Sequence, residues 1–119
     1  PAQSRQNPAA DPQYDAVGEA KRLLRTIRAG CLATLDEKGR PFATLVNIAT
    51  ASDGAPILLM STLATHTRYL EARPEASILL PQSGKGDPLA HPRLTVSSSL
   101  ARDHDPVRRA RFQSCHPKS

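Results

Sequence analysis

The chain is poor in aromatic residues: it has no tryptophan, two tyrosines and two phenylalanines, which together make 3% of its 119 residues. Its core therefore has to be built from leucine, isoleucine, valine and alanine. The same scarcity argues against single-stranded nucleic acid as a ligand, because proteins that bind it usually stack the bases on aromatic rings. The net charge of +5 comes from scattered basic residues, so we expect no nucleic-acid partner.

Cysteine is equally scarce. Cys31 and Cys115 are far apart, and no pair among the four histidines has the close spacing of a zinc site. We therefore predict no metal centre, a core position for Cys31 and free thiols in a cytoplasmic protein. No long apolar run is present, so we expect no membrane partner. A nucleophile elbow and a glycine-rich phosphate loop are also missing, and the catalytic residues stay unknown.

The composition divides the chain into a disordered arm, residues 1–14, and one domain, residues 15–119. The domain opens with a helix that Asp15 caps and that Gly30 ends in a left-handed conformation. Only 39% of the residues are apolar, which is little for a domain that stands alone. We therefore expect an oligomer.

Short apolar segments separated by turn residues predict strands over 31–35, 42–50, 57–61, 76–80 and 93–100. Helices are predicted over 65–72 and 106–112. This order favours a mainly β fold with flanking helices, in which the antiparallel strands form a small split β-barrel. Closing the sheet would protect the edges of the strands.

One stretch has the composition of an anion site. An apolar run ends in Ser61 and Thr62, and the predicted helix then begins with Thr65, His66, Thr67 and Arg68. Hydroxyls, free helix N–H groups and a guanidinium in one place suit a phosphate. In that site Thr65 or Thr67 can cap the helix; the alternative is that Thr65 simply caps the helix while His66 and Arg68 face water.

A second candidate is the strand that contains Ala43, Thr44, Leu45 and Val46. Alternation places Ala43, Leu45 and Asn47 on one face, and Phe42, Thr44 and Val46 on the other. Thr44 and open backbone groups could bind the polar edge of a flat ring. Without further support, an ordinary strand that contains a threonine explains the pattern as well.

Four ordered blocks carry a resemblance to a known family. They are CLATLDEKGRPFATLV (31–46), LMSTLATHTRYL (59–70), ARPEASILL (72–80) and GDPLAHPRLTV (86–96). Together they resemble the pyridoxamine 5′-phosphate oxidase-like, FMN-binding split-barrel proteins, in particular the branch linked to haem utilisation. The resemblance implies a homodimer that binds FMN in a groove between its subunits.

The same resemblance implies roles for individual residues. Ala43, Thr44, Leu45 and Val46 match the strand beside the isoalloxazine ring. The segment that holds the ribityl phosphate is matched by Ser61, Thr62, Thr65, His66, Thr67 and Arg68, with Arg93 as a weaker candidate. Tyr69 departs from the pattern, because this branch often has asparagine there.

The sequence thus predicts an FMN-binding protein, and a flavin-dependent oxidoreductase that acts on a small-molecule redox substrate. One alternative is a protein on the same fold that binds or degrades haem. Another is a dimeric binding module without enzymatic activity, which would use the barrel only as a scaffold.

Overall fold

The computed structural model describes residues 14–61 and 63–118. Except for Tyr14, the predicted arm lies outside these residues. The helices of the described part are α1 (Ala16–Thr26), α2 (Thr65–Ala72), α3 (Pro106–Cys115) and the short 3-10 helix η3 (Pro88–Ala90). The strands are β1 (Ala29–Leu35), β2 (Pro41–Asn47), β3 (Ala49–Thr50), β4 (Pro56–Ile57), β5 (Glu75–Pro81) and β6 (Arg93–Ser99).

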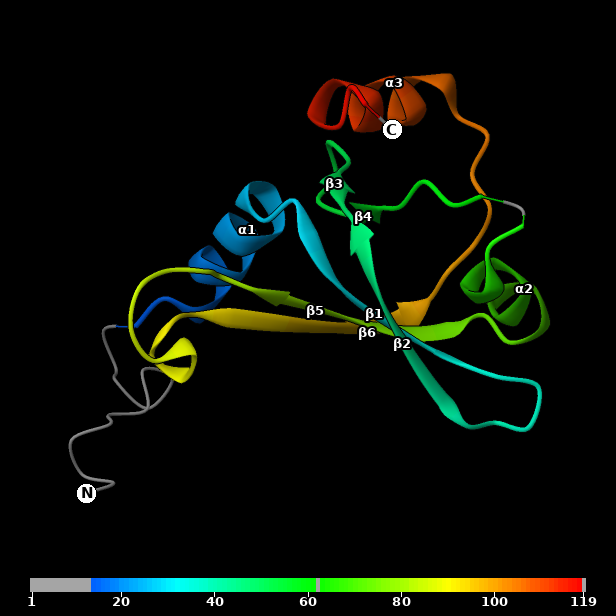
Figure 1. The fold of residues 1–119 in the computed structure, drawn as a ribbon. Coiled ribbons are helices and arrows are strands. Elements are labelled where there is room, and N and C mark those ends of the chain that lie inside the picture. Colours follow the sequence, from blue (N-terminus) through cyan, green and yellow to red (C-terminus); the bar gives the residue numbers. More distant parts are fainter. Residues whose placement is uncertain (1–13, 62, 119) are drawn as a thin grey trace.

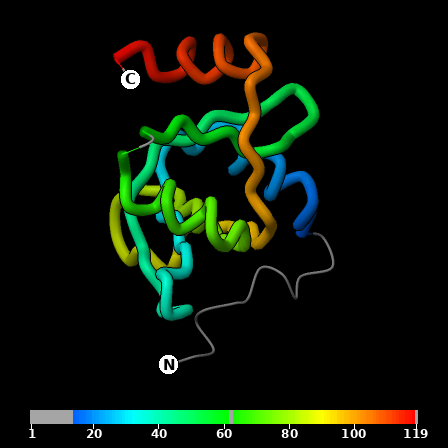
Figure 2. Tube along the Cα trace, turned by 90° about the vertical axis from the view of Figure 1, so that its right-hand side faces the viewer, coloured from blue at the N-terminus to red at the C-terminus, as the bar shows by residue number. Residues whose placement is uncertain are grey.

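The strands form two antiparallel sheets. The larger sheet has the order β2-β1-β5-β6, and β3 pairs with β4 in a second, two-stranded sheet. Figure 1 shows α1 and α3 on one side of the larger sheet, with β3 and β4 between α3 and that sheet. The view in Figure 2 shows the same layering. The fold is therefore mainly β with flanking helices, as predicted.

The core lies on the covered face of the larger sheet, which we call the inner face. Leu32, Ile48, Ile78 and Leu80 are buried there in one cluster. The partly buried residues that pack against this cluster are Leu24, Ile27, Val46, Leu58, Met60, Leu70, Ala76, Leu94 and Leu100. The core is thus built from aliphatic side chains, as the scarcity of aromatics requires.

The opposite, outer face of the larger sheet is uncovered within the described residues. The strand register places Leu45, Cys31, Leu79 and Thr95 in one row across it. Leu45 is 81% exposed and Leu79 38% exposed. The core position predicted for Cys31 is wrong: its side chain is half-buried on the outer face, because the alternation of β1 sends Leu32 inward instead.

Asp15 caps α1 as predicted, accepting a hydrogen bond of 2.9 Å from the N–H of Gly18. The predicted role of Gly30 is wrong, because the helix ends at an extended Ile27 (φ −82°, ψ 126°) and Gly30 lies within β1. A glycine is needed there for another reason. A Cβ on Gly30 would lie 2.5 Å from the carbonyl oxygen of Leu79 on the neighbouring strand.

The strand predicted over 42–50 is interrupted at Ile48. The backbone N–H of Ile48 donates to the carbonyl of Arg28 at 2.8 Å, and the Ile48 side chain lies in the core. The chain therefore leaves the larger sheet before β3. The strand predicted over 57–61 is reduced to β4, which ends at Ile57. Helix α2, in contrast, has the predicted bounds.

Candidate functional site

No side chain among the described residues caps the N-terminus of α2. The prediction that Thr65 or Thr67 caps the helix is wrong, because the N-cap residue is Ala64, whose side chain carries no oxygen. The backbone N–H groups of Thr65 and His66 make no hydrogen bond to a described residue. Free N–H groups and the positive end of the helix dipole favour an anion at this position.

Two hydroxyl groups near this end form hydrogen bonds with the loop before α2. The buried Thr67 hydroxyl donates to the backbone carbonyl of Ser61 at 2.6 Å. The Ser61 hydroxyl oxygen accepts from the N–H of Leu63 at 3.1 Å. These bonds fix the entry into α2, so the Thr67 proton is already used inside the protein. Thr62, another predicted phosphate contact, lies outside the described residues.

Arg68 is exposed in the first turn of α2. Its guanidinium forms no ion pair with residues 14–61 or 63–118, whereas Arg22, Arg40, Arg102 and Arg108 are each paired with a carboxylate. A guanidinium that has no ion pair among the described residues, in the first turn of the helix, suits a phosphate dianion, since it supplies charge-assisted hydrogen bonds.

The structure brings the two predicted segments together. The Thr44 hydroxyl of β2 and Nδ1 of His66 on α2 lie 3.2 Å apart. Near them, the rings of Phe42 and Tyr69 make an edge-to-face contact. Neither contact was expected from the sequence, because residues more than 20 positions apart show no local signal of pairing.

The side chains of residues 43–46 divide between the two faces of β2, as the alternation predicts. Thr44 and Val46 share the inner face with α2, while Ala43 and Leu45 lie on the outer face. Because β2 is an edge strand, part of its backbone has no partner strand. A flat ring beside β2 would therefore meet backbone groups and the outer side chains rather than all four side chains.

Arg93 is not brought to this site within one chain. It pairs with Pro81 at the far end of β5 from α2, and its guanidinium donates to the carbonyl of Leu89 at 3.3 Å. Thr65 lies half-buried at the first position of α2. The site formed by one chain therefore consists of the α2 N-terminus, His66, Arg68 and the adjoining edge of β2.

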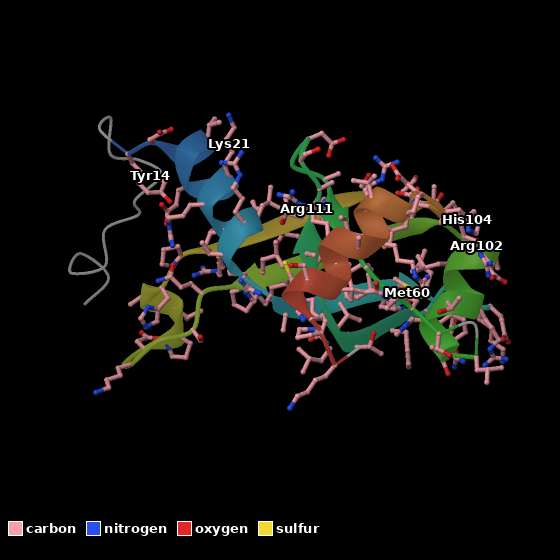
Figure 3. The ribbon with its side chains drawn as sticks, turned by 90° about the horizontal axis from the view of Figure 1, so that it is seen from above. Tyr14, Lys21, Met60, Arg102, His104 and Arg111 are labelled. Atoms are coloured by element: carbon pink, nitrogen blue, oxygen red, sulfur yellow. The ribbon has the colours of Figure 1, made fainter. Side chains whose placement is uncertain are left out.

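A separate cavity of about 1070 Å³ lies between β4, α2, β6 and α3. Its lining combines apolar core residues such as Met60 with charged residues of the segment before α3, and Figure 3 shows Arg102 and His104 beside this region. Arg102 pairs with Glu71. A hydrogen bond from Arg108 holds the pKa of the Asp103 carboxyl below its usual value.

Residues 14–61 and 63–118 contain no group of three or more histidine, cysteine, aspartate or glutamate residues that could hold a metal ion. None of the helices in this part is both long and apolar enough to cross a bilayer.

The antiparallel sheets, the flanking helices and the position of α2 beside β2 define a protein of the split-barrel class. A family model described as pyridoxamine 5′-phosphate oxidase matches residues 16–114. The chain belongs to this family.

Relatives of this chain include proteins named for haem. The chloroplastic non-canonical haem oxygenase HOZ of Arabidopsis thaliana is 31% identical over 106 residues, which are 87% of this chain and 33% of that protein. A haem-binding protein from Mycobacterium smegmatis is 33% identical with a TM-score of 0.78, over 85% of this chain and 43% of that one.

A protein of unknown function from Agrobacterium tumefaciens is 36% identical with a TM-score of 0.79, over 95% of this chain and 50% of that one. The chain thus spans between a third and half of the length of these three relatives.

Proposed function

We propose that this chain binds FMN noncovalently and takes part in flavin-dependent oxidation and reduction of a small molecule. The observation that supports the proposal is the N-terminus of α2, which no described side chain caps, together with Arg68, which pairs with no carboxylate among residues 14–61 and 63–118, next to the edge of β2. When bound, FMN supplies electron transfer through its isoalloxazine ring, which the protein's own side chains cannot provide.

The residues present suit the two ends of FMN. Thr65 and His66 offer backbone N–H groups to the phosphate, and Arg68 offers a charged partner. The edge of β2 at Ala43 and Leu45 offers an apolar, partly unpaired surface to the ring. The chain's contribution is to bind and orient the cofactor, and no side chain is assigned as acid or base.

We also propose that the outer face of the larger sheet is covered by a second copy of the chain. The row of Leu45, Cys31, Leu79 and Thr95 carries no charge, and Leu45 would otherwise leave most of its surface in water. Covering this face would bring the partner against β2 and complete the surroundings of the flavin ring.

A cytoplasmic location, in keeping with two free cysteines, belongs to the same proposal.

The absorbance spectrum of the purified protein, with and without added FMN, tests the flavin proposal. We expect flavin bands that stay with the protein through gel filtration, and quenching of FMN fluorescence on titration. A colourless protein that leaves FMN fluorescence unchanged would contradict the proposal and favour a binding module without enzymatic activity.

A haem protein on the same fold is the second candidate, supported by the names of the plant and mycobacterial relatives. The cavity of about 1070 Å³ offers His104 at its lining, and one histidine suffices to hold a haem iron. The rings of His66, His91 and His116 are already hydrogen-bonded within the protein.

Haem titration separates this candidate from the flavin proposal. A haem site in the cavity predicts a Soret shift that His104→Ala abolishes and that His91→Ala, a control between β5 and β6 and outside the cavity lining, leaves in place. A Soret band that is the same in both variants, or no shift in the unmodified protein, would reject a haem site at His104.

A further inference from the structure

The contact between Thr44 and His66 bears on which nitrogen of the His66 ring carries its proton. Thr44 Oγ1 and His66 Nδ1 lie 3.2 Å apart, and both side chains are half-buried between β2 and α2. Either atom could supply the hydrogen, depending on which ring nitrogen of His66 is protonated. The two arrangements differ in what the ring offers through its other nitrogen, Nε2.

The surroundings of Thr44 decide between the two arrangements. Among the described residues, the Thr44 hydroxyl has no hydrogen-bond partner other than His66. If Nδ1 carried the hydrogen, the hydroxyl would accept that bond and its own O–H would lack an acceptor in the protein. A donor left unsatisfied in a half-buried position is unfavourable. The favoured arrangement therefore has the hydroxyl donating to Nδ1, with the ring proton on Nε2.

We infer that Thr44 is a positioning residue, which holds His66 in the tautomer protonated at Nε2 and so makes the ring a hydrogen-bond donor at the N-terminus of α2. This inference rests on the proposed FMN site. A donor favours the phosphate, whereas the lone pair of an unprotonated Nε2 would repel it. The neighbouring Thr67 hydroxyl cannot take this role, because it donates to Ser61.

Thr44 then has a different role from the one that the family resemblance implies. The hydroxyl is engaged by the α2 histidine rather than directed toward a flat ring along β2. Thr44 of β2 thus acts on the phosphate end of the site through His66 of α2, which it contacts.

Nitrogen NMR of the histidine ring tests the inference without any cofactor. In the unmodified ¹⁵N-labelled protein we expect the His66 signals of the tautomer protonated at Nε2. In Thr44→Val we expect a shift toward a mixture of tautomers, and in Thr44→Ser recovery of the original pattern. Thr26→Val, at an exposed threonine at the end of α1, is the matched control and should leave the His66 signals unchanged. A ring protonated at Nδ1, or an unchanged pattern in Thr44→Val, would overturn the inference.

The second readout is the dissociation constant for FMN. We expect Thr44→Val to raise it by about tenfold, the effect of about one lost hydrogen bond to a charged group, and Thr44→Ser to restore it. Combining Thr44→Val with His66→Ala should add no further loss to that of His66→Ala alone, because Thr44 acts through the ring. Independent, additive losses would contradict this. If the unmodified protein binds no FMN, the proposed function fails, while the NMR result still decides whether Thr44 holds the ring.

Discussion

The rings of Phe42 on β2 and Tyr69 on α2 meet edge to face, with their centroids 5.3 Å apart and their planes at 89°. Such pairs stabilise a packing contact by about 0.5–1.5 kcal/mol beyond the burial of their surface. Here the pair fixes the helix against the edge strand, one helical turn from His66. Tyr69, where the resembled branch often has asparagine, thus contributes a packing contact between α2 and β2.

Arg68→Ala should weaken FMN binding by about tenfold or more, because a charge-assisted hydrogen bond to the phosphate contributes about 1.5–3 kcal/mol. Fluorescence titration measures the change. Arg68 is exposed and unpaired within the described residues, so the free energy of unfolding should stay within about 0.5 kcal/mol. Lys21→Ala, on the exposed side of α1, is the control. Equal FMN affinity in the Arg68 and Lys21 variants would remove Arg68 from the site.

Leu45→Glu should convert the proposed dimer to a monomer. The side chain is 81% exposed on the outer face, so the substitution leaves the core of the single chain intact. In a dimer, the new carboxylate would be buried without a partner, which is strongly unfavourable. Sedimentation velocity measures the change, and Val17→Glu at an exposed position of α1 is the control. A monomeric unmodified protein, or a Leu45→Glu dimer of unchanged stability, would contradict the proposed interface.

Gly30→Ala should destabilise the fold by about 1–3 kcal/mol, the usual range for overpacking. The added Cβ would lie 2.5 Å from the carbonyl oxygen of Leu79 and close to core side chains, so β1 and β5 would have to move apart. Chemical denaturation measures the loss. For comparison, Gly54→Ala meets no atom within 4 Å, and should cost about 1–2 kcal/mol from its positive φ alone. A Gly30→Ala protein as stable as the original would show that the strands tolerate the methyl group.

Asp36 should contribute a stabilising effect that depends on pH. The backbone N–H of Arg40, its guanidinium and the N–H of Lys38 donate to the Asp36 carboxylate, and these bonds hold the pKa of Asp36 below its usual value. The stabilisation is therefore fully present above the ordinary aspartate pKa of about 3.9. It is lost as the pH falls through the lowered value in the folded protein.

An NMR titration of the side-chain carboxyl carbon measures the pKa of Asp36. Arg40→Gln should raise it, because the guanidinium no longer favours the charged form. Asp36→Asn should remove this part of the acid dependence of stability. A pKa that Arg40→Gln leaves unchanged would assign the shift to the backbone N–H groups alone.

Local sequence patterns were sufficient for several elements. The helix predicted over 65–72 has the bounds of α2 in the structure. The alternation of residues 42–47 correctly predicts which side chains share a face of β2. Asp15 has the predicted role of helix cap. Each of these features depends on neighbours within a few positions, which is what periodicity and capping rules report.

The sequence by itself determined the aliphatic core and the antiparallel strands, because composition and periodicity are local properties. Only the tertiary structure decided that Gly30 lies in a strand against Leu79, that Cys31 faces outward, and that the chain leaves the larger sheet at Ile48. It also decided that Thr44 meets His66. These features depend on contacts between residues far apart in the chain, for which a single sequence carries no local signal.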